Sequence, residues 1–362
     1  MYGRVEVVRA RLLPRLRGTD SEVRGALASW DGQAYVHGND AGAEVVLVRP
    51  AGPQGDRWVL PIVMFLVTLF TTMAAGALLQ GVDPVRTRFI ELGWGWLPVP
   101  TGLNPRALWR GAVFSLPLLG ILLCHESGHY LAARRHKIPV SPLFFIPFPP
   151  WYSLVGTLGA FIRIRGPTVR RLELLDVAVA GPIASFLLSV PVLLLGLSLS
   201  KPVVGVANSE TPFFVRFAGE TVGLGDGPLL HAMSTLFFPG ALGVVPVELH
   251  PLAFAGWLGL FVTALNLMPL GQLDGGHILY CLWEQPGQVR AARLFLLALV
   301  PLGTLWWGWW LWGGGVLLVN RGRLRHPPVL LPAVPLDARR RLMSWFAILI
   351  FFLTFVAVPV SL

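Results

Sequence analysis

Apolar residues run along this chain in blocks of about 20, separated by polar or proline-rich stretches. A helix needs about 20 consecutive apolar residues to cross the hydrocarbon core of a bilayer. We expect about six transmembrane helices where the blocks reach or approach this length. They are residues 58–80, 107–133, 172–199, 252–270, 293–319 and 342–362.

Residues 1–57 follow a different pattern. The stretch VEVVRA alternates apolar and polar residues, AEVVLV is a β-branched run, and SEVRGALASW between them is compatible with a helix. The breaker-rich sequence PAGPQGD closes this region at residues 50–56. The pattern predicts a small extramembrane α+β region over residues 1–57, followed by a transmembrane domain over residues 58–362.

The stretch between residues 138 and 168 is apolar but cannot be a helix. Its first half, IPVSPLFFIPFPPWY, contains too many prolines, and GTLGAFIRIR after it alternates like a strand. Non-helical backbone is tolerated at membrane depth only where it packs on protein or lines a cavity. We therefore expect a re-entrant loop or β-hairpin, within a fold that is otherwise an all-α polytopic membrane protein.

Composition excludes two other classes of protein. With 54% hydrophobic and only 13% charged residues, the chain is too apolar for a soluble protein of this length. The net charge of +10 could indicate nucleic-acid binding, but the basic residues gather at the ends of the apolar blocks, at 134–137, 163–171 and 339–341. Such clusters are typical of the cytoplasmic ends of membrane spans. We expect a lipid bilayer and no nucleic acid as partner.

The same clusters predict the topology, with one conflict. A cytoplasmic N-terminus places the arginine-rich residues 1–57 and 134–171 inside. Simple alternation of six spans then places residues 320–341 outside, although they are also rich in arginine. Either the segment 293–319 folds back without crossing or the charge rule is overridden, and the sequence leaves both open.

The sequence HESGH, from His125 to His129, interrupts the second apolar block. Two histidines four residues apart lie on one face of a helix and can bind one metal ion, and Glu126 is close enough to act as a general base. Two imidazoles, a carboxylate and an open position suit Zn²⁺. The alternative is the solvated end of an interfacial helix, but ionisable residues within a span are functional by default.

Asp274 is the best candidate for a third ligand. It follows the fourth apolar block in NLMPLGQLDGGH, and if that block runs parallel to the second, Asp274 and His125 lie at the same membrane face. Its alternative reading is a turn, since Asp-Gly is a strong turn signal. His277, three residues further on, is either a partner that orients a ligand or a polar residue at the interface.

Together, HESGH and the later N-x-x-P-x-x-x-L-D-G pattern, from Asn266 to Gly275, resemble the site-2 protease family of intramembrane zinc metalloproteases, peptidase family M50. The surrounding sequence is similar to the branch without a PDZ insertion, which includes plastid EGY-type proteases and bacterial relatives. The resemblance implies one Zn²⁺ per chain and the following roles. His125, His129 and Asp274 would bind the metal, and Glu126 would be the general base. Asn266 would position the substrate backbone or the oxyanion, and residues 143–165 beside the active site would offer a strand edge to the substrate. Gly181 to Ser185 would match a small-residue motif of the family.

The function we expect is therefore a zinc metalloendopeptidase that cuts single-pass membrane proteins in or near their transmembrane segments, as in regulated intramembrane proteolysis. The location we expect is a bacterial inner membrane, with the N-terminus and active site towards the cytoplasm. The alternative is a zinc-stabilised membrane binding or chaperone protein, whose mark would be the loss of Glu126, and that residue is present. A metal-ion transporter would need further acidic or histidine residues along the spans.

Overall fold

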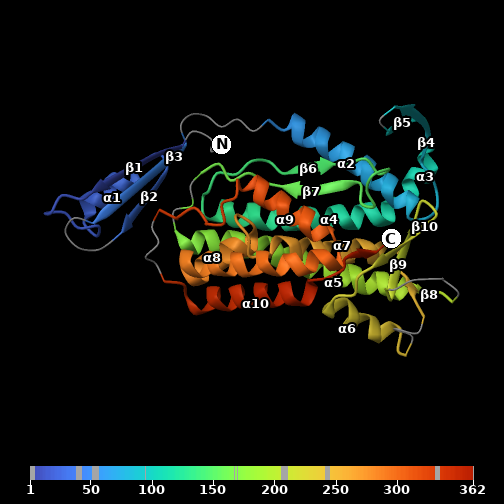
Figure 1. Cartoon of the computed structure of the whole chain (residues 1–362). Coiled ribbons are helices and arrows are strands. Elements are labelled where there is room, and N and C mark those ends of the chain that lie inside the picture. Colours follow the sequence, from blue (N-terminus) through green and yellow to red (C-terminus); the bar gives the residue numbers. More distant parts are fainter. Residues whose placement is uncertain are drawn as a thin grey trace.

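The computed structural model describes residues 5–37, 43–50, 57–93, 95–166, 168, 170–204, 211–240, 245–330 and 335–361. A bundle of roughly parallel and antiparallel helices forms the body of the molecule (Figure 1). A small unit containing the first strands lies at one end of the bundle, and further strands gather at the other end.

The N-terminal unit is a three-stranded antiparallel sheet with one helix, as the pattern over residues 1–57 predicts. Its strands have the order β1-β3-β2. Tyr35, Val46 and Val48 are its buried apolar cluster. The elements are β1 (Val5–Arg11), α1 (Ser21–Ala28), β2 (Gln33–His37) and β3 (Glu44–Pro50).

The bundle has a core of three helices that cross at small residues. These are α4 (Ala112–Arg135), α5 (Arg171–Leu199) and α7 (Pro251–Asn266), which pack on one another. A Cβ at Gly128 of α4 would lie 2.6 Å from the carbonyl oxygen of Ala180, and one at Gly256 would lie 2.6 Å from the backbone nitrogen of Leu193. Helix backbones approach this closely only where a side chain is missing, so these glycines set the crossings.

The remaining helices surround this core. Among the described residues, three helices are long and apolar enough to cross a membrane: α2 (Val59–Leu78), α5 and α8 (Asp274–Leu305). The shorter helices are α3 (Pro105–Arg110), α6 (Pro228–Phe237), α9 (Gly308–Val319) and α10 (Ala338–Thr354). Six spans were predicted, and the blocks at 58–80 and 172–199 match single helices.

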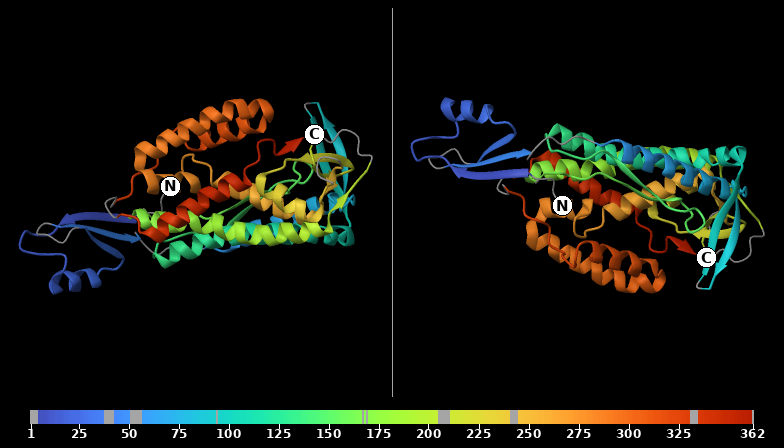
Figure 2. Two further views of the ribbon diagram at one scale, coloured as in Figure 1. Left: turned by 90° about the horizontal axis from the view of Figure 1, so that it is seen from below. Right: turned by 90° about the horizontal axis from the view of Figure 1, so that it is seen from above.

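The prediction of one helix over residues 293–319 is wrong. The helix α8 bends at Glu284, where φ is 57° and ψ is −172°, and then continues to Leu305. The chain turns at Trp306, and α9 returns alongside α8, with Trp310 seated against Gly303. Figure 2 shows these two orange helices set off to one side of the bundle. Hydropathy missed the turn because tryptophan is apolar and keeps the block continuous.

Three other predicted spans have different limits. The block at 107–133 is divided between α3 and α4, with a break at Gly111. The block at 252–270 forms a helix of only 16 residues. The block at 342–362 is helical to Thr354, and its last residues form the strand β12 (Val360–Ser361).

The predicted hairpin is present, but other sheets make the all-α prediction wrong. The strands β6 (Phe144–Pro147) and β7 (Thr157–Phe161) pair antiparallel, and α2 packs against β6. A second hairpin joins β4 (Val85–Leu92) to β5 (Gly95–Leu103). A five-stranded sheet has the order β12-β10-β9-β11-β8. Its strands are β8 (Lys201–Pro202), β9 (Phe213–Phe217), β10 (Glu220–Leu224), β11 (Val247–Glu248) and β12.

An ion-pair cluster brings Arg340 beside the start of α5 and the end of α4. Both oxygens of Asp176, near the start of α5, accept hydrogen bonds of 2.7 Å from Arg340, and His136 lies 2.9 Å from one of them. The arginine-rich segments 134–137 and 339–341 therefore lie at one end of the bundle, which we call the basic end. The chain folds back within residues 293–319, since α8 and α9 form an antiparallel pair.

Candidate metal centre

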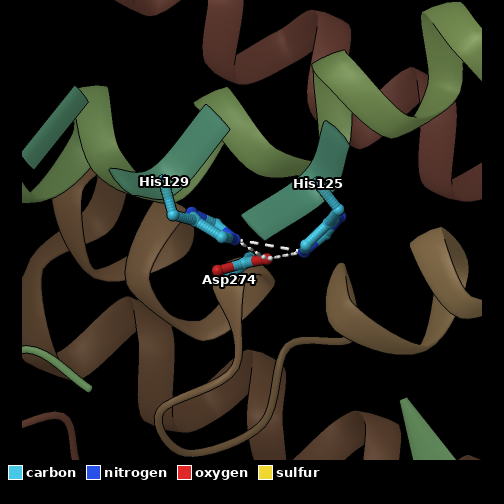
Figure 3. Close-up of side chains that lie close together, drawn as sticks. All are labelled: His125, His129 and Asp274. Carbon is cyan, nitrogen blue, oxygen red and sulfur yellow. Dashed lines mark hydrogen bonds and ion pairs between the residues drawn. The ribbon is translucent and has the colours of Figure 1, made fainter. Parts of the chain in front are cut away.

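Three polar side chains meet inside the bundle, close to the middle of α4. His125 and His129 lie one helical turn apart on α4, and Asp274 is the first residue of α8 (Figure 3). The two Nε2 atoms lie 3.1 Å apart, and Oδ2 of Asp274 is 3.5 Å and 3.3 Å from them. Both histidines are buried. The sequence-predicted ligands are thus brought together, although Asp274 is about 145 residues from the histidines in the chain.

The spacing of these three atoms fits a tetrahedral metal ion. Zn²⁺ binds histidine nitrogen and carboxylate oxygen at about 2.0–2.2 Å, so two ligands at the corners of a tetrahedron lie about 3.3–3.5 Å apart. The three observed separations lie within about 0.3 Å of this range. Two imidazoles and one carboxylate leave the fourth corner open, as in catalytic zinc sites.

Hydrogen bonds on the far side of each ring leave Nε2 free to bind a metal. Nδ1 of His129 donates to the carbonyl oxygen of Val177 at 2.8 Å, and a carbonyl can only accept. Nδ1 of His125 lies 3.0 Å from the hydroxyl of Ser185, which can donate its own proton to the Gly181 carbonyl at 3.2 Å. Each ring then carries its proton on Nδ1 and a lone pair on Nε2, the arrangement typical of metal-binding histidines.

Sequence reasoning missed the role of Ser185. The spacing from Gly181 to Ser185 indicated close helix packing, and Ser185 is 60 residues from His125 in the chain. A buried hydroxyl on a helix otherwise lined with apolar residues is the signal that could have identified it, because such a group needs a partner.

Gly181 makes room for the ring of His129 rather than for a helix backbone. A Cβ at this position would lie 2.2 Å from Nε2 of His129. Gly128, by contrast, makes room for a neighbouring helix, since the atoms nearest to its missing side chain belong to Ala180 and Gly181 of α5.

Glu126 lies beside the three ligands and is 8% exposed. Ile162, just after β7, lines the same cavity as Glu126, and β7 packs against α4. The hairpin therefore lies beside the residue predicted to be the general base.

The cluster opens into a cavity of about 840 Å³. Its walls come from α4, from α5, from residues 160–164 at the end of β7 and just after it, and from residues 326–330. Asn266 also lines it, with Nδ2 3.5 Å from Nε2 of His125. His277 lines the cavity too, but its ring hydrogen-bonds with His326 at 2.6 Å. Its predicted role in orienting a ligand stays a prediction.

Comparison with known proteins places the chain in a family. The model of Peptidase family M50 matches residues 113–302, which is just over half of the 362 residues and includes all three members of the cluster. The chain belongs to peptidase family M50. Together with the three candidate spans, this membership makes it an integral membrane protein.

Several plant proteins named as probable zinc metalloproteases are similar to it. "Probable zinc metalloprotease EGY1, chloroplastic" of Arabidopsis thaliana is 32% identical over 229 residues, 61% of this chain and 39% of the relative. The EGY2 protein of the same plant is 33% identical over 195 residues, which are 53% of this chain and 31% of that relative. The EGY3 protein of Oryza sativa subsp. japonica is 31% identical over 226 residues, which are 58% of this chain and 36% of that relative. The alignments span less than two fifths of the length of these relatives. No solved structure matches the chain.

Proposed function

We propose that this protein is an intramembrane zinc metalloendopeptidase that hydrolyses peptide bonds in or near the transmembrane segments of membrane proteins. His125, His129 and Asp274 hold the Zn²⁺, and Glu126 is the general base. The observation that carries the proposal is the tetrahedral spacing of the three donors beside a buried carboxylate. The plant relatives, named as probable zinc metalloproteases, also support it.

The chemistry divides between the metal and the chain. Zinc bound at this cluster supplies a Lewis acid that polarises the scissile carbonyl and makes a water molecule acidic. The carboxylate of Glu126 takes the proton from the attacking water and returns it to the leaving nitrogen. The amide of Asn266, on the cavity wall beside His125, donates a hydrogen bond to the substrate backbone or to the developing oxyanion.

The hairpin explains how a helical substrate could be cut. A transmembrane helix satisfies its own backbone hydrogen bonds, so a peptide bond becomes accessible only if new partners replace them. The strand β7 pairs with β6 on one side, and residues from its end line the cavity on the other. An unwound substrate segment can add there as a further strand, with its backbone beside Glu126. The proposed substrates are single-pass membrane proteins, and the proposed process is regulated intramembrane proteolysis.

We place the basic end in the cytoplasm. Arginine clusters at 134–137 and 339–341 meet there, and cytoplasmic loops carry an excess of basic residues. His129 precedes the end of α4 at Arg135 by six residues, which corresponds to about 9 Å along a helix. The metal site then lies inside the bilayer near its cytoplasmic face. The membrane we propose is a bacterial inner membrane, whereas the plant relatives are chloroplastic by name.

The test replaces Glu126 with Gln and compares cleavage of a single-pass membrane protein in proteoliposomes. Glu126→Gln keeps the size of the side chain but removes the base, so we expect cleavage to fall at least 10²-fold, roughly the contribution of general base catalysis, while bound zinc stays at one per chain. Glu91→Gln, on the exposed hairpin β4–β5 at the opposite end, is the matched control and should cleave normally.

The same assay separates the protease from the binding or chaperone alternative. Equal cleavage by the wild type and Glu126→Gln would reject the assigned mechanism. If neither form cleaves any substrate offered while both bind zinc and retain a membrane protein, the binding alternative is the better description.

A further inference from the structure

The segment of residues 324–330 forms a wall of the metal-site cavity that the proposed chemistry does not use. It follows α9 and precedes α10 in the chain. Residues 326–330 line the cavity together with residues 160–164, and His326 and Val329 are buried while Pro327 and Pro328 are exposed.

Side chains of α8 hold this segment in place. His277 hydrogen-bonds the ring of His326 at 2.6 Å, and the ring of Tyr280 stacks on that of His326 with centroids 4.3 Å apart. Gln285 and Gln288 donate to backbone carbonyls of the segment at 2.8 Å and 2.9 Å. Burial lowers the pKa of His326 to about 3, so its ring is neutral at physiological pH. These contacts are local, and a change of the segment's position would break them together.

The N-terminal unit contacts the same segment from outside the bundle. Leu330 packs against the buried cluster of Tyr35, Val46 and Val48. Leu330, which also lines the cavity, is thus part of the apolar core of the N-terminal unit. A sheet of three short strands with one helix has little apolar surface of its own, so this contact contributes to its stability.

Further contacts dock the N-terminal unit on the basic end. The side-chain amide of Gln33 donates to the carbonyl oxygens of His136 and Lys137, at 2.8 Å and 2.6 Å, just after α4 ends. The guanidinium of Arg170, which precedes α5, lies 4.7 Å from the centre of the Tyr35 ring. The helices that the unit touches, α4 and α5, are those that carry the two histidines and their partners.

We propose that the N-terminal sheet is a docked cap that rests on Leu330 and covers the metal-site cavity from outside the segment 324–330, and that undocking of this sheet admits the substrate. The inference rests on the proposed function, since it assigns a regulation to that same site. Among the described residues the docking contacts are few: two hydrogen bonds from Gln33, the cation–π contact of Arg170, a contact of Tyr35 with Glu173, and the packing of Leu330. Such a small interface opens reversibly, whereas the packed helices of the core stay closed.

The test measures access to the cavity without using proteolysis. Ala160→Cys places a thiol on the cavity wall at the end of β7, in a variant whose native cysteines are replaced, and a water-soluble maleimide labels it in proteoliposomes. Gln33→Ala removes both docking hydrogen bonds and should raise the labelling rate by about tenfold. Leu330→Ala removes the contact between segment and cap and should also raise it. Glu6→Gln breaks only an exposed ion pair on β1 and is the matched control.

The outcomes separate the cap from the protease. Faster labelling in both Gln33→Ala and Leu330→Ala, but not in Glu6→Gln, supports the cap. Labelling that is equally fast in the wild type and in both variants overturns it, even if the wild type cleaves substrates normally. Faster labelling without cleavage in any form keeps the cap and rejects the proposed function.

Discussion

Gly181→Ala tests whether the shape of α5 positions a metal ligand. The new methyl group would lie 2.2 Å from Nε2 of His129, whereas ordinary van der Waals contact begins at 3.4 Å. The ring or the helix must therefore move by about 1.2 Å. Metal–ligand distances tolerate only about 0.2 Å, so His129 can no longer share a metal ion with His125 and Asp274 in their present positions.

The expected loss of zinc affinity is at least about 100-fold. Removing an outer partner of a metal ligand typically lowers affinity 10- to 100-fold, and displacing the ligand itself should exceed that. The assay is competition for Zn²⁺ against a chelator of known affinity, with purified protein in detergent. A thermal unfolding curve without zinc reports whether the bundle still folds.

Gly120→Ala is the matched control, because it lies on α4, five residues before His125, and a Cβ there meets no other atom within 4 Å. Alanine is the better helix former by about 1 kcal/mol, so this variant should bind zinc normally and unfold at the same or a higher temperature. Wild-type zinc affinity in Gly181→Ala would refute the positioning argument.

Three further predictions concern the surroundings of the cluster. Ser185→Ala should weaken zinc binding by about tenfold, because His125 loses the group that orients its ring. The control Ser189→Ala, on the same helix, removes a hydroxyl that has no hydrogen-bond partner, and this variant should bind zinc normally. Removing zinc with a chelator should abolish cleavage and lower the unfolding temperature, and adding it back should restore both; full activity in the metal-free protein would contradict the zinc assignment. Arg340→Ala should destabilise the protein by roughly 1–3 kcal/mol, because it removes both hydrogen bonds to the carboxylate of Asp176. The control Arg339→Ala, at an exposed position, should change stability by less than about 0.5 kcal/mol. Equal unfolding temperatures for the two variants would show that the contact contributes nothing.

Local pattern was enough for the helices of the core and for most of the site. Two histidines four residues apart face the same side of any helix, so HESGH specified a pair of ligands before the fold was known. The prolines between 138 and 168 excluded a helix there, and the hairpin β6–β7 is the result. Asp274 could be chosen as the third ligand because few carboxylates lie in an apolar context, and such residues are functional by default.

Long-range pairing decided what the pattern could not. The strands β9, β10 and β12 belong to one sheet although β12 lies at the far end of the chain, and short strands carry little signal until their partners are known. The turn between α8 and α9 lies within a continuous apolar block. It became visible only when α9 packed back on α8, and the described residues 339–341 then lie at the basic end.

The sequence by itself determined which atoms could bind a metal, because ligand chemistry and helical periodicity are properties of neighbouring residues. Only the tertiary structure decided how those atoms are held. Ser185 and Val177 orient the two rings across 60 and 48 residues of chain, and Gly181 leaves the space that His129 fills. Such partners depend on which helix faces cross, and a glycine such as Gly128 permits a close crossing without specifying which helix packs there.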